Sequence, residues 1–335
     1  MKDFIKKFLK IGIPLFVGIY LTWYFFNQMS EEAMQSFYKA LRETNYWIVA
    51  LSLAIGVLTY WSRAYRWKYT LEPLGYSSSS WNRYHSLMIG YIINLTIPRA
   101  GEASRAVMLQ RSDNVPFSVS FGTIITERIV DIVILLAITF LTMLLARDDF
   151  WLLYEEMLKE FGAGNQNSGS NIFYILLIVF TVSLSILFLI KKTRDLIIKF
   201  AKSLIDGILS IFKLTHPWSY IGHTALIWVG YVVMFSLPYY SLQETMYVPF
   251  EGIMVAFIAG SVGISFTNGG IGTYPLLVGF VTAFYLKRQG VDDALAIANA
   301  LGMLIWASQA LIMIIMGLIS LYFLPKNYLQ DAARS

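Results

Sequence analysis

The chain has 335 residues, of which 57% are hydrophobic and 14% are charged, and its formal net charge is +5. Soluble domains contain about 45–50% apolar and about 25% charged residues, so this composition excludes an ordinary water-soluble fold. The basic residues lie in short segments between apolar runs, which argues against nucleic-acid binding, and the absence of cysteine excludes disulfides and thiolate metal sites.

Six apolar runs are long enough to cross a bilayer, which takes about 20 residues each. They lie near residues 11–26, 46–62, 118–146, 171–190, 222–242 and 294–324. The lysines before the first run resemble the start of a signal peptide, but no small-residue cleavage site follows, so we expect a retained first helix. The sequence therefore predicts an all-α polytopic membrane protein with six full spans.

Two further apolar regions, 84–112 and 250–286, are each interrupted by proline, glycine or polar residues, and we expect two broken re-entrant hairpins there. The arms of hairpin one contain about 10–13 residues, which reach about 15–20 Å at the helical rise, or half a bilayer. The arms of hairpin two are longer, near 250–266 and 270–286, so two full spans stay an alternative for that region.

Lysines and arginines in the short loops set the expected orientation, with the N terminus and the C terminus both cytoplasmic. A polar external loop, 162–171, divides a single transmembrane domain, 1–335, into a first half, 1–161, and a second half, 172–335. Each half has the same order of a span, a second span, a broken hairpin and a third span. Since the halves start on opposite sides of the membrane, we expect an inverted repeat, which in transporters places the substrate near the bilayer midplane.

Hairpin one turns at a segment that puts two arginines and a carboxylate inside the membrane. Pro98 and Gly101 break the helix. Arg99, Glu102 and Arg105 surround the break, and charged side chains at this depth usually mark a pathway for substrate or ions. The second arm begins with backbone N–H groups that favour an anion, and arginine binds phosphate through two parallel hydrogen bonds. We therefore expect this break to bind a phosphate.

The next span carries Glu127, Arg128 and Asp131 within a long apolar run. Glu127 and Asp131 are four residues apart, so they lie on one face of a helix, at about the depth of the hairpin-one break. One interpretation pairs these carboxylates with Arg99 or Arg105 and makes them structural. The other interpretation lets them alternate between arginine and substrate and carry a coupling proton. The sequence leaves both interpretations open.

Hairpin two has a neutral, glycine-rich break. It comprises Asn268, Gly269, Gly270, Gly272 and Thr273. Glycines let backbone amides approach a ligand closely, so we expect this break to face hairpin one and to form the second part of the substrate site. Close helix packing in membranes also selects glycine, which is the structural alternative. A nucleotide-binding loop is excluded because no Walker lysine and no preceding strand are present.

Two further groups of residues are interpreted as structural. One group ends the second span, and its tryptophans and arginines are typical of a helix anchored to lipid headgroups. It comprises Trp61, Arg63, Arg66 and Trp67. The other group is a stripe of small residues that predicts close packing of a helix, within the chain or in a homo-oligomer. It comprises Gly252, Ala256, Gly260 and Gly263.

Three of these motifs together resemble a known family. They are the Pro-Arg-Ala-Gly-Glu sequence within Asn94–Arg105, Glu127-Arg128 with Asp131, and the Gly-Gly-Ile-Gly-Thr sequence at Gly269–Thr273. Over nearly all of residues 10–325, the chain resembles the membrane domain of lysylphosphatidylglycerol synthases, the lipid flippase half of the bacterial multiple peptide resistance factor, which also occurs as stand-alone proteins. The resemblance implies a multi-pass protein of the plasma (inner) membrane. Bifunctional members continue into a soluble aminoacyl-transferring domain, and this chain stops at Ser335, so no synthase activity is expected.

These features predict a transporter and not an enzyme. The resemblance implies a flippase whose cargo is an anionic phospholipid, an aminoacyl phospholipid or a polyprenyl-phosphate-linked lipid, with the headgroup bound at Arg99, Arg105 and Arg128. The first alternative is a membrane-embedded lipid-modifying transferase that uses Glu127 or Asp131 as base, and the second is a transporter of small anions. We expect a membrane lipid as partner and no catalytic residue, metal or cofactor, because the three histidines match no zinc spacing.

Overall fold

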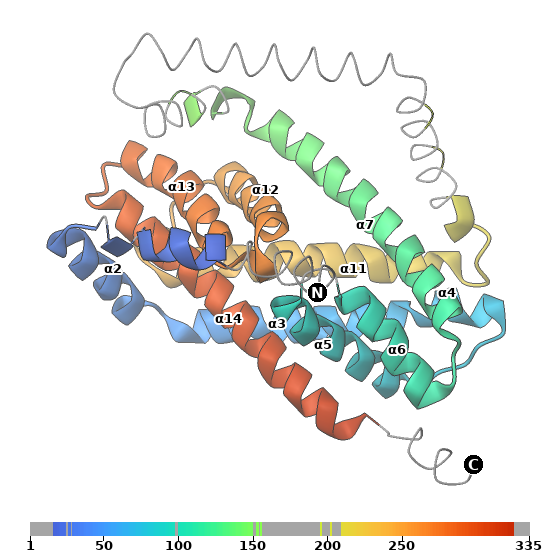
Figure 1. The fold of residues 1–335 in the computed structure, drawn as a ribbon. Coiled ribbons are helices and arrows are strands. Elements are labelled where there is room, and N and C mark those ends of the chain that lie inside the picture. The colour runs from blue at the N-terminus through green and yellow to red at the C-terminus, as the bar shows by residue number, and fades with distance from the viewer. Residues whose placement is uncertain are drawn as a thin grey trace. The chain divides into compact units, whose positions relative to one another are not determined.

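The structure is a computed structural model that describes residues 16–24, 26–27, 29–97, 100–149, 152–153, 155, 195, 202 and 209–324. Within these ranges all regular structure is helical, as the sequence predicts (Figure 1). The chain divides into two compact units, one of Met1–Ile125 with Leu214–Ser335 and one of Thr126–Lys213. The predicted loop 162–171 and the predicted span 171–190 lie outside the described residues.

Short connections join the described helices, except between Leu145 and Pro217, where most of the chain lies outside the described residues. In chain order, the α-helices are α2 (Glu31–Glu43), α3 (Tyr46–Arg66), α4 (Lys68–Leu71), α5 (Ser80–Thr96), α6 (Gly101–Asp113), α7 (Phe117–Leu145), α11 (Pro217–Ser236), α12 (Phe250–Phe266), α13 (Thr273–Arg288) and α14 (Ala294–Phe323). Short 3₁₀ helices join some of them, namely η1 (Glu72–Leu74), η2 (Leu237–Ser241) and η3 (Asn268–Gly270).

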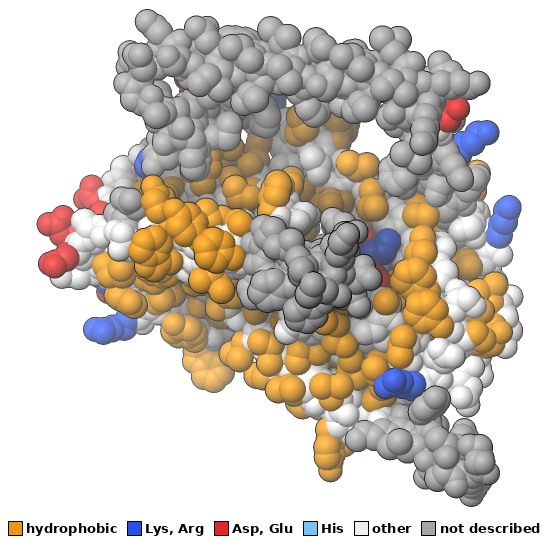
Figure 2. Space-filling view, in the orientation of Figure 1, with side chains coloured by type: hydrophobic (Ala, Val, Ile, Leu, Met, Phe, Trp, Pro, Cys, Tyr) orange, Lys and Arg blue, Asp and Glu red, His pale blue; other side chains and the backbone are white. Residues whose placement is uncertain are grey.

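Four helical stretches of the described chain are long and apolar enough to cross a membrane. They are Tyr46–Leu74, Phe117–Leu145, Pro217–Ser241 and Ala294–Phe323. They agree with four of the six predicted spans, and residues 16–24 of the first predicted span are also helical. Large apolar side chains such as Leu318 on α14 are exposed, and Figure 2 shows hydrophobic side chains over much of the described surface. Such a surface suits lipid as the surrounding solvent, so the chain is a helical membrane protein.

Helices α3 and α11 form an antiparallel pair in the first unit (Figure 1). Near the N-terminal end of α3, the Ser52 hydroxyl donates a hydrogen bond of 2.7 Å to the carbonyl of Met234, which lies near the C-terminal end of α11. In the middle of the pair, a side chain at Gly230 would collide with Thr59. Glycine therefore lets these two helices approach closely, because it adds no side-chain volume between them.

The predicted break in hairpin one is confirmed, since α5 ends at Thr96 and α6 begins at Gly101. The two arms touch at glycines, because a Cβ atom built on Gly101 would lie 2.6 Å from the carbonyl oxygen of Gly90. Helix α14 packs against the first arm, where a hydrogen bond of 3.0 Å joins His85 Nδ1 and Ser320 Oγ. Whether this hairpin is re-entrant stays a prediction.

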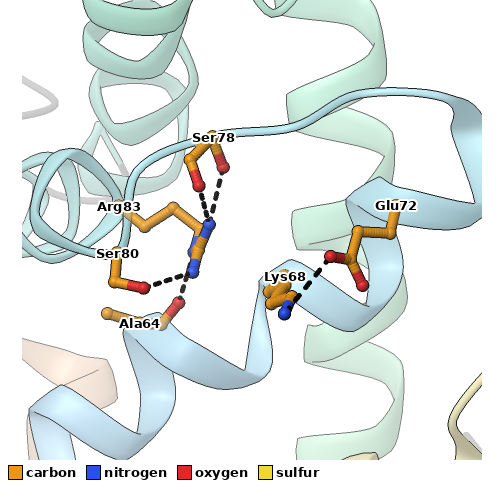
Figure 3. A network of polar contacts seen from close by, with 6 residues as sticks. All are labelled: Ala64, Lys68, Glu72, Ser78, Ser80 and Arg83. Carbon is orange, nitrogen blue, oxygen red and sulfur yellow. Dashed lines mark hydrogen bonds and ion pairs between the residues drawn. The ribbon is translucent and has the colours of Figure 1, made fainter.

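A buried arginine fixes the start of hairpin one (Figure 3). The Arg83 guanidinium donates from Nε to the carbonyl of Ala64 over 3.1 Å and from Nη2 to the hydroxyl of Ser80 over 2.9 Å. Its Nη1 donates to both the carbonyl and the hydroxyl of Ser78. One planar side chain thereby ties the loop before α5 to the C-terminal end of α3, which sets where hairpin one begins.

Replacing Arg83 with lysine is expected to lower the free energy of unfolding by about 1–3 kcal/mol, because a single ammonium cannot reach acceptors that lie on several sides of the guanidinium. The matched control is Arg42→Lys, since Arg42 is exposed on α2. Unfolding in mixed detergent and dodecyl sulfate micelles measures both changes. Equal free energies for the two variants would contradict the structural role of the Arg83 network.

The predicted break in hairpin two is also confirmed, with α12 ending at Phe266 and α13 beginning at Thr273. The stripe of small residues on α12 packs against α13 of the same chain. A Cβ atom on Gly252 would lie 2.7 Å from the Tyr285 ring, and one on Gly260 would lie 2.8 Å from the Tyr274 ring. The sequence left open whether this stripe packs within the chain or between copies, and the structure assigns it to the chain itself.

Helix α14 packs against α13, the second arm of hairpin two, at another glycine. A Cβ atom on Gly302 would lie 2.6 Å from the carbonyl oxygen of Pro275, which belongs to the backbone and cannot rotate away. We expect Gly302→Ala to lower the free energy of unfolding by about 1–3 kcal/mol through overpacking. The control is Gly222→Ala on α11, where the added Cβ atom meets no atom within 4 Å. If the two alanine variants unfold alike in mixed micelles, the close contact between α13 and α14 is wrong.

Candidate functional site

Arg105 occupies the second turn of α6, and its side chain is only 2% exposed. Its guanidinium carbon lies 3.7 Å from the centroid of the Trp67 ring, which is a cation–π contact. The Trp67 indole Nε1 in turn donates a hydrogen bond of 2.8 Å to the hydroxyl of Thr123 on α7. The charge of Arg105 is therefore held over the ring of a tryptophan whose own position is fixed by a hydrogen bond.

The local sequence explains why Arg105 lies at the break. Helix α6 begins at Gly101, and residues four apart share one face of a helix, so Arg105 projects from the same face as Gly101. That face packs on α5, where a Cβ atom on Gly90 would lie 3.4 Å from the Arg105 Cβ. Glu102 occupies the first turn of α6, where a carboxylate is favoured by the helix dipole.

The structure brings Glu102 and Arg105 together on the first two turns of α6 and confirms that a helix begins there. Arg99 and Pro98 lie outside the described residues. An apolar cluster surrounds the stem of α6 and the Trp67 ring. It comprises Trp67, Leu71, Ala106, Leu109, Val115 and Ile124. A buried arginine in such surroundings acts in a medium of low dielectric constant, where its attraction for an anion is stronger than in water.

The interpretation of Arg63, Arg66 and Trp67 as headgroup anchors is wrong, because all three side chains are buried. The Arg63 guanidinium donates to the hydroxyl of Tyr231 over 2.8 Å, and the Arg66 guanidinium donates to the hydroxyl of Thr224 over 3.0 Å. The three residues share the i, i+3, i+4 spacing of one helical face, and this face turns inward toward α6 and α11. Trp67 contacts Arg105, whereas Arg63 and Arg66 hold α3 against α11.

The charged motif of α7 belongs to the second unit and forms a helix, as predicted. Arg128 Nη1 lies 3.7 Å from Asp131 Oδ2, an ion pair between neighbouring turns. Glu127 is fully buried, and Asp131 is nearly so. Pairing of these carboxylates with the arginines of hairpin one stays a prediction.

The break of hairpin two is held by its own hydrogen bonds. The Thr273 hydroxyl donates to the carbonyl of Gly263 over 2.7 Å and lies 2.7 Å from the hydroxyl of Thr267. From α14, the Trp306 indole Nε1 donates to the carbonyl of Gly269 over 2.8 Å. The turn is therefore a fixed structure, and Asn268 is buried within it.

The broken ends of the two hairpins meet. A Cβ atom on Gly269, at the break of hairpin two, would lie 2.7 Å from Leu95 Cδ2, in the last turn of the first arm of hairpin one. Sequence reasoning gave no signal for this contact, because neither residue has a distinctive chemistry. It did predict that the two breaks face each other, and Leu95 and Gly269 place the two tips side by side.

Comparison with known proteins agrees with the motifs. The family model described as lysylphosphatidylglycerol synthase TM region matches residues 11–317. UPF0104 membrane protein MJ1595 of Methanocaldococcus jannaschii is 33% identical over 104 residues, which cover 30% of this chain and 31% of the relative. The matched segment thus spans less than a third of that relative's length. No solved structure matches the chain significantly. Because the family model covers most of the chain, the protein belongs to the lysylphosphatidylglycerol synthase transmembrane-region family.

Proposed function

We propose that the protein is a lipid transporter of the plasma (inner) membrane that moves a phosphate-bearing lipid between leaflets and binds the headgroup at the start of α6. The observation that carries this proposal is the buried Arg105 guanidinium, held on Trp67 one turn after a break in hairpin one. A helix start offers backbone N–H groups to an anion, and an arginine beside it adds two directed hydrogen bonds. A lipid phosphate has the charge and the oxygens that this combination recognises.

The meeting of the two hairpin tips supports transport over the alternatives. Transporters with inverted repeats bind substrate where broken helices face each other, near the bilayer midplane. Here Leu95 and Gly269 bring the breaks together within the first unit. Alternating access then moves one half of the repeat against the other, while the acyl chains stay in the bilayer. The cargo is an anionic phospholipid, an aminoacyl phospholipid or a polyprenyl-phosphate-linked lipid.

The charged motif of α7 supplies a means of coupling in this scheme. Asp131 holds Arg128 through an ion pair between adjacent turns. A substrate phosphate that binds Arg128 would compete with Asp131 for the guanidinium, and the carboxylate that alternates between these two states would carry the coupling proton. Substrate binding and proton binding are thereby linked at one carboxylate.

Leaflet-sided lipid labelling in proteoliposomes tests the proposed function. The purified protein is reconstituted with fluorescent analogues of phosphatidylglycerol and phosphatidylcholine and with a polyprenyl phosphate, and a membrane-impermeant reagent reports which leaflet each occupies. We expect at least one phosphate-bearing lipid of net negative charge to cross faster than in protein-free vesicles. Movement of soluble phosphate alone would favour the small-anion transporter. A chemically altered lipid would favour the transferase.

A further inference from the structure

A long groove runs between α3 and α11 on the surface of the first unit, with a volume of about 870 Å³. Its walls along the middle of the helices are apolar and include Ile55, Leu58, Val229 and Val233. The floor closes where Gly230 lets α11 approach α3. Leu58 and Val229 are exposed, so this part of the groove opens toward the surrounding hydrocarbon of the membrane.

The other end of the groove is polar and aromatic. Ser62, Tyr65 and Tyr69 of α3 and α4 line it together with His223 of α11. A hydrogen bond of 2.8 Å joins Ser62 Oγ and His223 Nδ1, which leaves Nε2 as the imidazole nitrogen that can bond a ligand. The histidine ring lies 5.1 Å from the Tyr65 ring and 5.9 Å from the Tyr69 ring, so the three rings form one surface.

The positively charged side chain of Lys68 lies beside the polar end of the groove. The Lys68 ammonium lies 5.8 Å from the centroid of the Tyr65 ring and 3.3 Å from the carboxylate of Glu72, as the ion pair in Figure 3 shows. Lysine and tyrosine side chains in such positions keep their polar tips at the membrane surface and their stems in the apolar region. The groove therefore has an apolar length and a polar end that can receive negative charge.

Helix α3 separates this groove from the buried arginines. Ser62, Tyr65 and Tyr69 are spaced by three and four residues, so they occupy one face of the helical segment. Arg63 and Arg66 occupy the neighbouring face, which is buried. The groove is thus a surface distinct from the Arg105 site, although the same stretch of chain supports both.

We infer that this groove binds one acyl chain of a membrane phospholipid, with the phosphate at Tyr65, Tyr69 and His223. The seven helical steps from Ile55 to Ser62 rise about 10 Å, so the apolar walls cover much of the hydrocarbon depth of one leaflet, which is about 15 Å. The length of the apolar walls and the polar end, where tyrosine, histidine and serine side chains gather, both favour a lipid.

Photo-crosslinking in proteoliposomes tests this inference. The probe is a phosphatidylglycerol that carries a diazirine in one acyl chain, and the comparison probe is a long-chain alcohol with the same diazirine and no phosphate. We expect the phospholipid to label the segments 55–69 and 223–233 preferentially. Val229→Trp fills the groove and should reduce this labelling at least fivefold. Val229 is 62% exposed, so the larger side chain disturbs no core.

Two further variants sharpen the result. The matched control is Val262→Trp on α12, where Val262 is 47% exposed outside the groove, and it should leave the labelling unchanged. His223→Phe should reduce labelling by the phospholipid but not by the alcohol, because only the phosphate needs the imidazole. Labelling spread evenly over all exposed helices, an unchanged yield in Val229→Trp, or a crosslink between two copies of the chain at these segments would overturn the inference.

The groove and the proposed transport can fail separately. Arg105→Lys protein should keep full labelling of the groove, because Arg105 does not line it. If the wild-type protein moves no lipid while the groove is still labelled, only the proposed function is wrong. If lipid moves while the groove is not labelled, only the inference fails.

Discussion

Arg105→Lys is expected to slow the movement of an anionic lipid between leaflets by about 10–100-fold, which corresponds to a charge-assisted hydrogen bond of about 1.5–3 kcal/mol. Lysine keeps the positive charge but loses the planar fork that binds two phosphate oxygens at once. It also changes the cation–π contact with Trp67, whose ring centroid lies 3.7 Å from the guanidinium carbon. The leaflet-labelling assay with fluorescent phosphatidylglycerol measures the rate.

The control for this variant is Arg111→Lys, because Arg111 lies on the same helix and is exposed. It should transport at the wild-type rate. Unfolding of both variants in mixed micelles separates a lost contact with phosphate from a lost structural contact. If Arg105→Lys moves lipid as fast as the wild type, the phosphate site at α6 is wrong. If it loses stability and slows every lipid equally, Arg105 supports the fold and does not select the headgroup.

The spans and the hairpin breaks could be predicted because their causes are local. A run of about 20 apolar residues needs no partner to be recognised, and Gly269, Gly270 and Gly272 interrupt a helix by their own backbone, since all three have a positive φ. The small-residue stripe on α12 also carried real information, since it predicted a close helix contact. The stripe could not identify α13 as the helix that packs on it, because a glycine predicts a close contact but not the segment that makes it.

The inward face of α3 could not be predicted for the opposite reason. Arginine and tryptophan at the end of an apolar run have the same pattern whether the helix stops at a membrane surface or continues into the protein. What decides between the two is the partner, and Arg66 donates to Thr224, which lies 158 residues away in the chain. A single sequence does not record such contacts. The contact of Leu95 with Gly269 escaped prediction for the same reason.

Gly272→Ala is expected to lower the free energy of unfolding by about 2–5 kcal/mol, the sum of a backbone term and a packing term. Gly272 has φ +74°, a left-handed conformation that costs a residue with a Cβ atom about 1–2 kcal/mol. The added Cβ atom would also collide with the carbonyl of Gly18 and lie 2.9 Å from the Thr22 hydroxyl. Because a carbonyl of the backbone cannot rotate away, the helix at residues 16–24 or the turn of hairpin two must move.

Two other glycines separate these terms. Gly290 has φ +75° and no atom within 4 Å of an added Cβ atom, so Gly290→Ala should show the backbone term alone. Gly302→Ala meets the carbonyl of Pro275 without a left-handed backbone and should show the packing term alone. Unfolding in mixed micelles should therefore rank Gly272→Ala as the most damaging of the three. If it is no worse than Gly290→Ala, the packing of residues 16–24 against hairpin two is wrong. If it is clearly worse, and lipid movement also stops in the variant at temperatures where it stays folded, the turn of hairpin two takes part in transport as well as in the fold.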